Sequence, residues 1–152
     1  MEMDRMSQTQ LRAWLAAVIW ALAGAGFAVA FFARGGPTEY GADRARIVTG
    51  AVAIAAGYVA HLVAMWATRT RGGEVAADER DAQVVARASR ATLVVVLMAV
   101  FALSVGLWEA YRVEGAVPVG WLWFLAYGTV IATFLVHSVA TLVVDARYGG
   151  HG

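Results

Sequence analysis

Four runs of residues without any Asp, Glu, Lys or Arg constrain the fold of this chain more than any other feature. They lie at residues 13–33, 47–67, 91–108 and 119–144. A helix rises about 1.5 Å per residue, so each run has the roughly 18–20 residues needed to cross a hydrocarbon layer of about 30 Å. No run contains proline, so the backbone hydrogen bonds can close within each helix, as lipid requires.

Composition supports the same fold class. The chain is 61% hydrophobic with a mean hydropathy of +0.63, above the apolar share of a typical soluble domain. We therefore predict an all-α fold, an integral membrane four-helix bundle forming a single domain over residues 1–152. Its spans are expected at about residues 11–33, 46–68, 90–111 and 118–144. The first run is too long for the apolar core of a signal peptide and lacks a small-residue cleavage site.

The arginines predict the orientation, because the chain contains no lysine. With four spans, the two termini and the connection at 69–90 share one side. That side carries eight arginines: Arg5, Arg12, Arg69, Arg71, Arg80, Arg87, Arg90 and Arg147. The other side carries four: Arg34, Arg44, Arg46 and Arg112. The positive-inside rule therefore places both termini in the cytoplasm of a multi-pass protein of the cell membrane, the inner membrane in a two-membrane cell.

A charged stretch at 74–90 continues into the third apolar run with no glycine or proline between them. We expect one helix from near Ala77 to Tyr111, about three turns longer than the membrane needs. Residues 77–90 would extend this helix into the cytoplasm. Acidic residues at 78, 79 and 81 suit its start, because negative charge is favourable at the positive end of a helix dipole.

The same stretch carries a family resemblance. "DERD" (78–81) followed by "VVARASRATLVVVL" (84–97) is similar to the signature of a family of small predicted membrane proteins of unknown function. In that family an Asp-Glu-Arg motif precedes small and basic residues that lead into a span. The resemblance covers roughly residues 70–150 and implies a four-helix membrane protein with the motif at the cytoplasmic face. Asp78, Glu79 and Arg80 are thus candidates for binding a partner, the alternative being a solvated helix start.

The chain also resembles itself. "RAWLAAVIWA" (12–21) aligns with "RATLVVVLMA" (90–99), and "HLVAMW" (61–66) with "HSVATL" (137–142) at an offset that differs by two residues. This similarity suggests the hypothesis of a duplicated helical hairpin.

Two histidines, His61 and His137, lie inside the second and fourth spans. Spacing by four residues places His61 on one face with Ala53 and Gly57, a small-residue face that permits close helix packing. It places His137 on one face with Thr129 and Thr133, a face that carries hydroxyl groups. We therefore expect both histidines to face protein rather than lipid.

Two interpretations of this pair remain open. His61 and His137 would bind one haem iron as axial ligands from facing helices, or they would be neutral and hydrogen-bonded to threonine or backbone across the helix interface. No acidic ligand or propionate clamp is evident in the spans. We therefore expect hydrogen bonding, no bound cofactor or metal, and rings on unconnected faces.

The function classes narrow by elimination. The sequence shows no nucleophile–base pair, paired intramembrane carboxylates or phosphate loop, so we expect no catalytic residues and no enzyme activity. A net charge of +1 gives no support to nucleic-acid binding, and the absence of cysteine excludes thiolate chemistry. We predict a scaffold that oligomerises or joins a larger membrane complex in the lipid bilayer. Haem-based electron transfer is the first alternative, and a small transporter or channel-like oligomer is the second.

The predicted orientation can be tested with reporter fusions. Fusions at Gly36 and Gly115 should report an external location, while fusions at Gly73 and at the C-terminus should report a cytoplasmic one. A cytoplasmic signal from Gly36 would contradict the topology.

Overall fold

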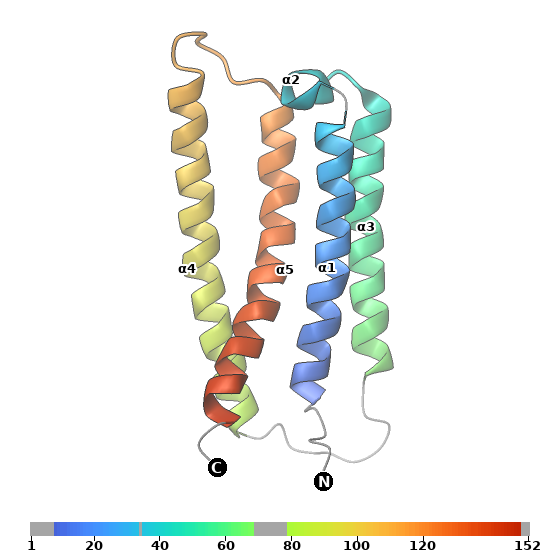
Figure 1. Ribbon diagram of the computed structural model, residues 1–152, viewed down its shortest axis with the longest axis vertical. Coiled ribbons are helices and arrows are strands. Elements are labelled where there is room, and N and C mark those ends of the chain that lie inside the picture. Colours follow the sequence, from blue (N-terminus) through green and yellow to red (C-terminus); the bar gives the residue numbers. More distant parts are fainter. Residues whose placement is uncertain (1–7, 34, 69–78, 150–152) are drawn as a thin grey trace.

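The structure is a computed structural model that describes residues 8–33, 35–68 and 79–149. Its helices are α1 (Gln8–Phe32), α2 (Gly36–Tyr40), α3 (Arg44–Ala67), α4 (Glu79–Ala110) and α5 (Gly120–Gly149), and no strand occurs in the described ranges. The predicted all-α class is confirmed. Figure 1 shows four long helices side by side with α2 across one end.

The four long helices form an open row in the order α4, α5, α1, α3 (Figure 1). Helix α1 packs against both α3 and α5, whereas α4 packs along α5. Among the described residues, α3 and α4 make no contact of comparable extent. We call the end where α1 and α4 begin and α3 and α5 end the termini end, and the opposite end the α2 end.

This order bears on the hypothesis of a duplicated hairpin. The pairs α1–α3 and α4–α5 would be equivalent halves, and both pack internally. A two-fold relation would then turn the α1–α5 contact into an α4–α3 contact of similar extent, which the described helices lack. The two halves are therefore joined asymmetrically, whatever their origin.

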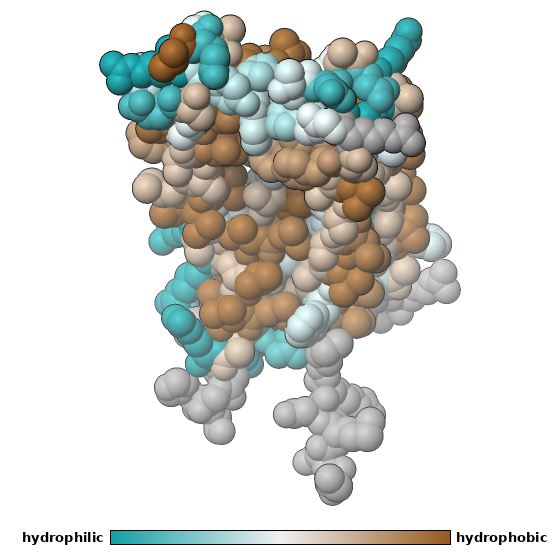
Figure 2. Space-filling view, turned by 45° about the horizontal axis from the view of Figure 1, so that its top comes forward, coloured by the Kyte–Doolittle hydropathy of each residue, from teal (hydrophilic) through white to brown (hydrophobic). Residues whose placement is uncertain are grey.

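All four long helices are long and apolar enough to cross a membrane. On the face shown in Figure 2, hydrophobic residues form a band across the middle, and hydrophilic residues gather toward the two ends. Helix α4 is continuous over 32 residues, so the third span and its extension are a single helix, as predicted. The predicted start near Ala77 lies outside the described residues, where the helix is seen from Glu79.

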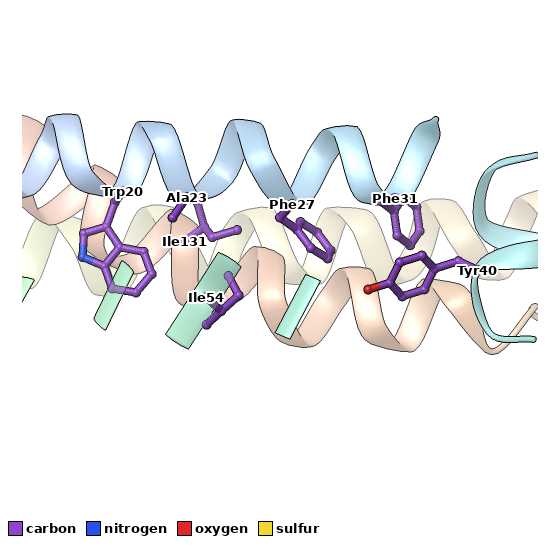
Figure 3. Packing of buried hydrophobic residues seen from close by; sticks show 7 residues of the cluster. All are labelled: Trp20, Ala23, Phe27, Phe31, Tyr40, Ile54 and Ile131. Atoms are coloured by element: carbon purple, nitrogen blue, oxygen red, sulfur yellow. The ribbon is translucent and has the colours of Figure 1, made fainter. Parts of the chain in front are cut away.

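The core lies between α1 and its two neighbours. Large rings from one face of α1 point toward Ile54 of α3, Ile131 of α5 and Tyr40 of α2 (Figure 3). Trp20 is fully buried, and its ring stacks on Phe134 of α5 with 4.3 Å between centroids and 3° between planes. Offset or parallel ring pairs of this kind add to the packing contacts that hold helices together in lipid.

The short helix α2 was not predicted from the sequence. Gly35 and Gly36 both have positive φ values, 78° and 70°, which glycine adopts at little cost and other residues rarely adopt. This turn lets the chain fold back so that Tyr40 is fully buried over the ends of α1 and α3. Gly120 lies so close to the carbonyl oxygen of Pro37 that a side chain there would collide with it. Glycine is thus required where α5 begins beneath α2.

Charged residues complete the α2 end. The Asp43 carboxylate caps α3 by accepting hydrogen bonds from the backbone N–H groups of Ala45 and Arg46, at 3.0 and 3.2 Å. The buried Arg46 side chain in turn donates to the carbonyl oxygens of Ala30 and Phe31 at 3.1 and 2.5 Å. Those carbonyl groups belong to the last turn of α1, where carbonyl oxygens lack N–H partners within the helix. A positive charge there also suits the helix dipole.

The side chain of Tyr40 fits a gap left by a glycine of α3. A Cβ atom on Gly50 would collide with Tyr40 Oη, and it would also lie 3.3 Å from Phe27. Burial raises the pKa of the Tyr40 phenol above its ordinary value, and Tyr127 adds to the increase while the charge of Arg46 opposes it. Because Gly50 and Phe27 lie against it, the Tyr40 ring has little room to move.

Replacing Gly50 by alanine should destabilise the fold by about 1–3 kcal/mol, because Tyr40 or the helix must shift to relieve the collision. Gly128→Ala is the matched control, since a Cβ atom there would meet only Phe124, at 4.0 Å. Thermal unfolding in detergent would compare the two variants. Equal midpoints would contradict the packing described for Tyr40.

Candidate ligand site

His61 and His137 line the same cavity near the termini end. The cavity has a volume of about 380 Å³ and lies between α1, α3, α4 and α5. Its lining residues are Thr9, Arg12, Ala13, Ala16, His61, Met65, Val85, Phe134, His137, Ser138 and Thr141. The expectation that the two rings occupy unconnected faces is therefore wrong. Both α3 and α5 pack on α1, whose small residues Ala13 and Ala16 leave space between the two histidines.

The His61 ring packs among aromatic side chains. Its centroid lies 5.1 Å from that of Phe134 and 6.4 Å from that of Trp20. The Nδ1 atom of His61 is buried without a hydrogen-bond partner. We expected His61 to be hydrogen-bonded across the helix interface, but its Nδ1 atom makes no such bond with the described residues.

The hydroxyl groups of α5 bond within their own helix. Thr129 donates to the carbonyl oxygen of Leu125 at 2.6 Å, and Thr133 to that of Thr129 at 2.7 Å. In the cavity wall, Ser138 and Thr141 likewise donate to carbonyl oxygens one turn earlier. These hydroxyl groups therefore bond to backbone carbonyl oxygens and not to either imidazole ring, which is the usual arrangement of Ser and Thr in apolar helices.

The predicted packing residues of α3 lie toward α1. A side chain on Gly57 would meet the Cβ atom of Ala23 at 3.0 Å and the ring of Trp20 at 3.5 Å. Ala53 lies opposite Gly26 of α1. A Cβ atom added to Gly26 would lie 3.7 Å from the Cβ atom of Ala53. His61 follows Gly57 by one turn on the same side of α3 and lines the cavity.

Arg12 supplies positive charge at the rim of the cavity. Its Nε atom donates to the hydroxyl oxygen of Thr68 at 3.1 Å, and Nη2 donates to the Thr68 carbonyl oxygen at 2.8 Å. These bonds join the first turns of α1 to the end of α3. Thr68 caps that helix end, so the guanidinium also lies where a helix dipole favours a cation.

A second polar cluster, formed by Gln10, Arg80 and Asp145, joins three helices beside the cavity. Asp145 of α5 is only 3% exposed. Arg80 of α4 forms an ion pair with its Oδ1 atom at 3.3 Å, and Gln10 of α1 donates to Oδ2 at 2.5 Å. Nearby, the Thr9 hydroxyl donates to Asp81 at 3.2 Å. Sequence reasoning missed this role of Asp145, although an acidic residue two turns after an intramembrane histidine was a usable signal.

The structure gives the three motif residues different positions. Asp78 lies outside the described residues, and Glu79 is exposed in the first turn of α4. Arg80 is paired with Asp145, so this guanidinium already has a partner within the chain. A role in binding another protein stays a prediction.

Comparison with known proteins identifies the family. Residues 9–141 match the family described as "Predicted membrane protein (DUF2178)". The chain belongs to this family. The match covers more of the chain than the resemblance around the motif, and it includes both histidines and Arg80 but not Asp145. No curated protein and no solved structure matches the chain.

Membership of the DUF2178 family agrees with a multi-pass membrane protein and brings no activity with it. Within the described part of the chain, no group of three or more His, Cys, Asp and Glu side chains is placed to hold a metal ion. The expectation of no bound cofactor and its alternative, haem binding by His61 and His137, both stay untested.

The cluster at Asp145 should contribute more to stability than its number of bonds suggests. Arg80→Met leaves a buried carboxylate with Gln10 alone and should cost about 1–3 kcal/mol, whereas Asp145→Asn removes the charge and should cost less. Adding Arg80→Met to Asp145→Asn should then change little.

The matched control is Arg112→Met. Arg112 pairs with Glu109 at 3.9 Å on the surface, and both side chains are more than half exposed. Such pairs contribute little, so this variant should unfold at nearly the wild-type midpoint. An Arg80→Met variant as stable as the control would show that the pair between half-exposed Arg80 and buried Asp145 is not stabilising.

Proposed function

We propose that this DUF2178 protein is an oligomerising membrane scaffold, in which α4 packs against α4 of a second copy. The open row of helices carries this proposal. Helix α4 packs along α5 and leaves most of its apolar surface exposed, because α3 lies at the other end of the row.

The contact between α4 and α5 is tightest near the termini end. Near the termini end, Val84 and Ala88 are fully buried and Thr92 is 6% exposed. Toward the α2 end the two helices diverge in Figure 1 and enclose a groove of about 260 Å³. Its walls include Ala99 and Leu103 of α4 and Gly128 of α5.

Small residues flank this groove on the surface of α4. Ala99, Ala102, Gly106 and Ala110 are all exposed and lie on one side of the helix. A Cβ atom on Gly106 would meet nothing within 4 Å. Small residues spaced by about four let two helix backbones approach closely in lipid, where packing rather than hydrophobicity drives association. Two copies can supply the same stripe to each other, as a two-fold interface requires.

Neither alternative function gains the same support from the described residues. The four spans are continuous helices, whereas transporters commonly build their sites from broken ones. Electron transfer through haem would rest on the two histidines that line the cavity near the termini end.

The scaffold proposal is tested by the oligomeric state of Gly106→Leu. The wild-type chain should form a dimer or larger oligomer in detergent and in liposomes. The bulkier side chain should weaken it at least about tenfold by separating the two backbones. Light scattering and energy transfer between labelled copies would measure this.

Ala25→Leu is the matched control, because Ala25 is an exposed small residue of α1. This variant should associate like the wild type, and both variants should keep the wild-type unfolding midpoint of the monomer. A monomeric wild type in liposomes, or an undiminished oligomer of Gly106→Leu, would overturn the proposal.

A further inference from the structure

The cavity that holds His61 and His137 has the size of a binding site for one or two rings. Its volume of about 380 Å³ is two to three times that of an apolar cavity of about 150 Å³ that holds benzene. A tetrapyrrole has four rings with side chains and exceeds this space. Phe134 occupies part of the region beside His61, with 5.1 Å between the ring centroids.

The walls combine apolar surface with hydrogen-bond donors. Alanine, valine, methionine and phenylalanine side chains form the apolar part. The two imidazoles and the Arg12 guanidinium add N–H groups, and none of the described lining residues carries a carboxylate. Arg12 has five N–H donors, and its bonds to Thr68 use two of them. A complementary molecule is apolar, about one or two rings in size, and carries oxygen acceptors.

The surroundings of His61 indicate whether its Nε2 atom would bind a metal or donate a hydrogen bond to an acceptor. Nδ1 is buried without a partner, so only Nε2 is left to meet a molecule in the cavity. A histidine that binds a metal through Nε2 carries its proton on Nδ1 and almost always donates it to a carboxylate, carbonyl or water. Among the described residues, no carboxylate or carbonyl oxygen accepts from His61 Nδ1. Its proton is better placed on Nε2, where the ring becomes a donor toward the cavity.

We propose that this cavity binds a membrane-soluble quinone. The Nε2–H group of His61 donates to one carbonyl oxygen, and the remaining N–H groups of Arg12 serve the other, nearer the termini end. Phe134 and the small residues of α1 provide the apolar walls for the ring. This site is independent of the α4 surface proposed for association.

The purified full-length chain in nanodiscs tests the proposal with two ring-matched probes, 2-methyl-1,4-naphthoquinone and 2-methylnaphthalene. The quinone should raise the unfolding midpoint with increasing concentration, because a molecule that binds only the folded state stabilises it. The hydrocarbon has the same ring without oxygens and should not. This comparison uses the wild-type chain and does not depend on the folding of any variant.

Variants of His61 then assign the donor. His61→Phe keeps a ring without the N–H group and should bind the quinone about tenfold more weakly, the effect of losing one hydrogen bond. His61→Gln keeps an N–H donor and should stay within about threefold of the wild type. Thr129→Val is the control in α5, because its hydroxyl bonds within its own helix and does not line this cavity.

Three outcomes would overturn the proposal. Equal stabilisation by both probes would indicate partitioning into lipid, and unchanged binding by His61→Phe would remove the donor. A low-spin haem spectrum in the purified chain that is lost in both His61→Phe and His137→Gln would assign the cavity to haem instead.

Discussion

The packing of α1 between α3 and α5 organises the whole structure. In lipid the surroundings are as apolar as the side chains, so helices associate through close fit and hydrogen bonds. Trp20 illustrates the fit, because its ring stacks on Phe134, meets the edge of Tyr58 at 5.0 Å and covers Gly57. Large rings on α1 therefore meet rings in α5, and they meet both a ring and small residues in α3. Helix α4 is attached to this unit through α5 and through polar contacts at the termini end.

Those aspects of the fold that depend on one segment at a time were predictable. Absence of charge over the length of a membrane determines a span, and the unbroken stretch through Arg87 and Arg90 determined a continuous α4. Helix α2 was missed because "GGPTEYG" has the residues of a loop, and only its packing through Tyr40 makes it a structural element.

The candidate site was less predictable, because it depends on which helices are neighbours and how each is rotated. The spacing of residues placed His61 and His137 on protein-facing sides of their helices. It could not predict the helix order α4, α5, α1, α3, which brings both histidines to one cavity. Asp145 was missed for a related reason. An acidic residue near a helix end is usually solvated, and here Gln10 and Arg80 from two other helices bury it.

The position of Asp145 along the chain also has a consequence for assembly. Gln10 lies 135 residues before Asp145, and Arg80 lies 65 residues before it. The ribosome therefore makes their shared acceptor last. The first hairpin can pack as it emerges, since the contacts of Arg46 and Trp20 with α1 and α3 are already complete. Gln10 and Arg80 must wait until α5 has been inserted. A chain that stops short of Asp145 would thus lack the one acceptor that Gln10 of α1 and Arg80 of α4 share, and these two helices would not yet be joined through it.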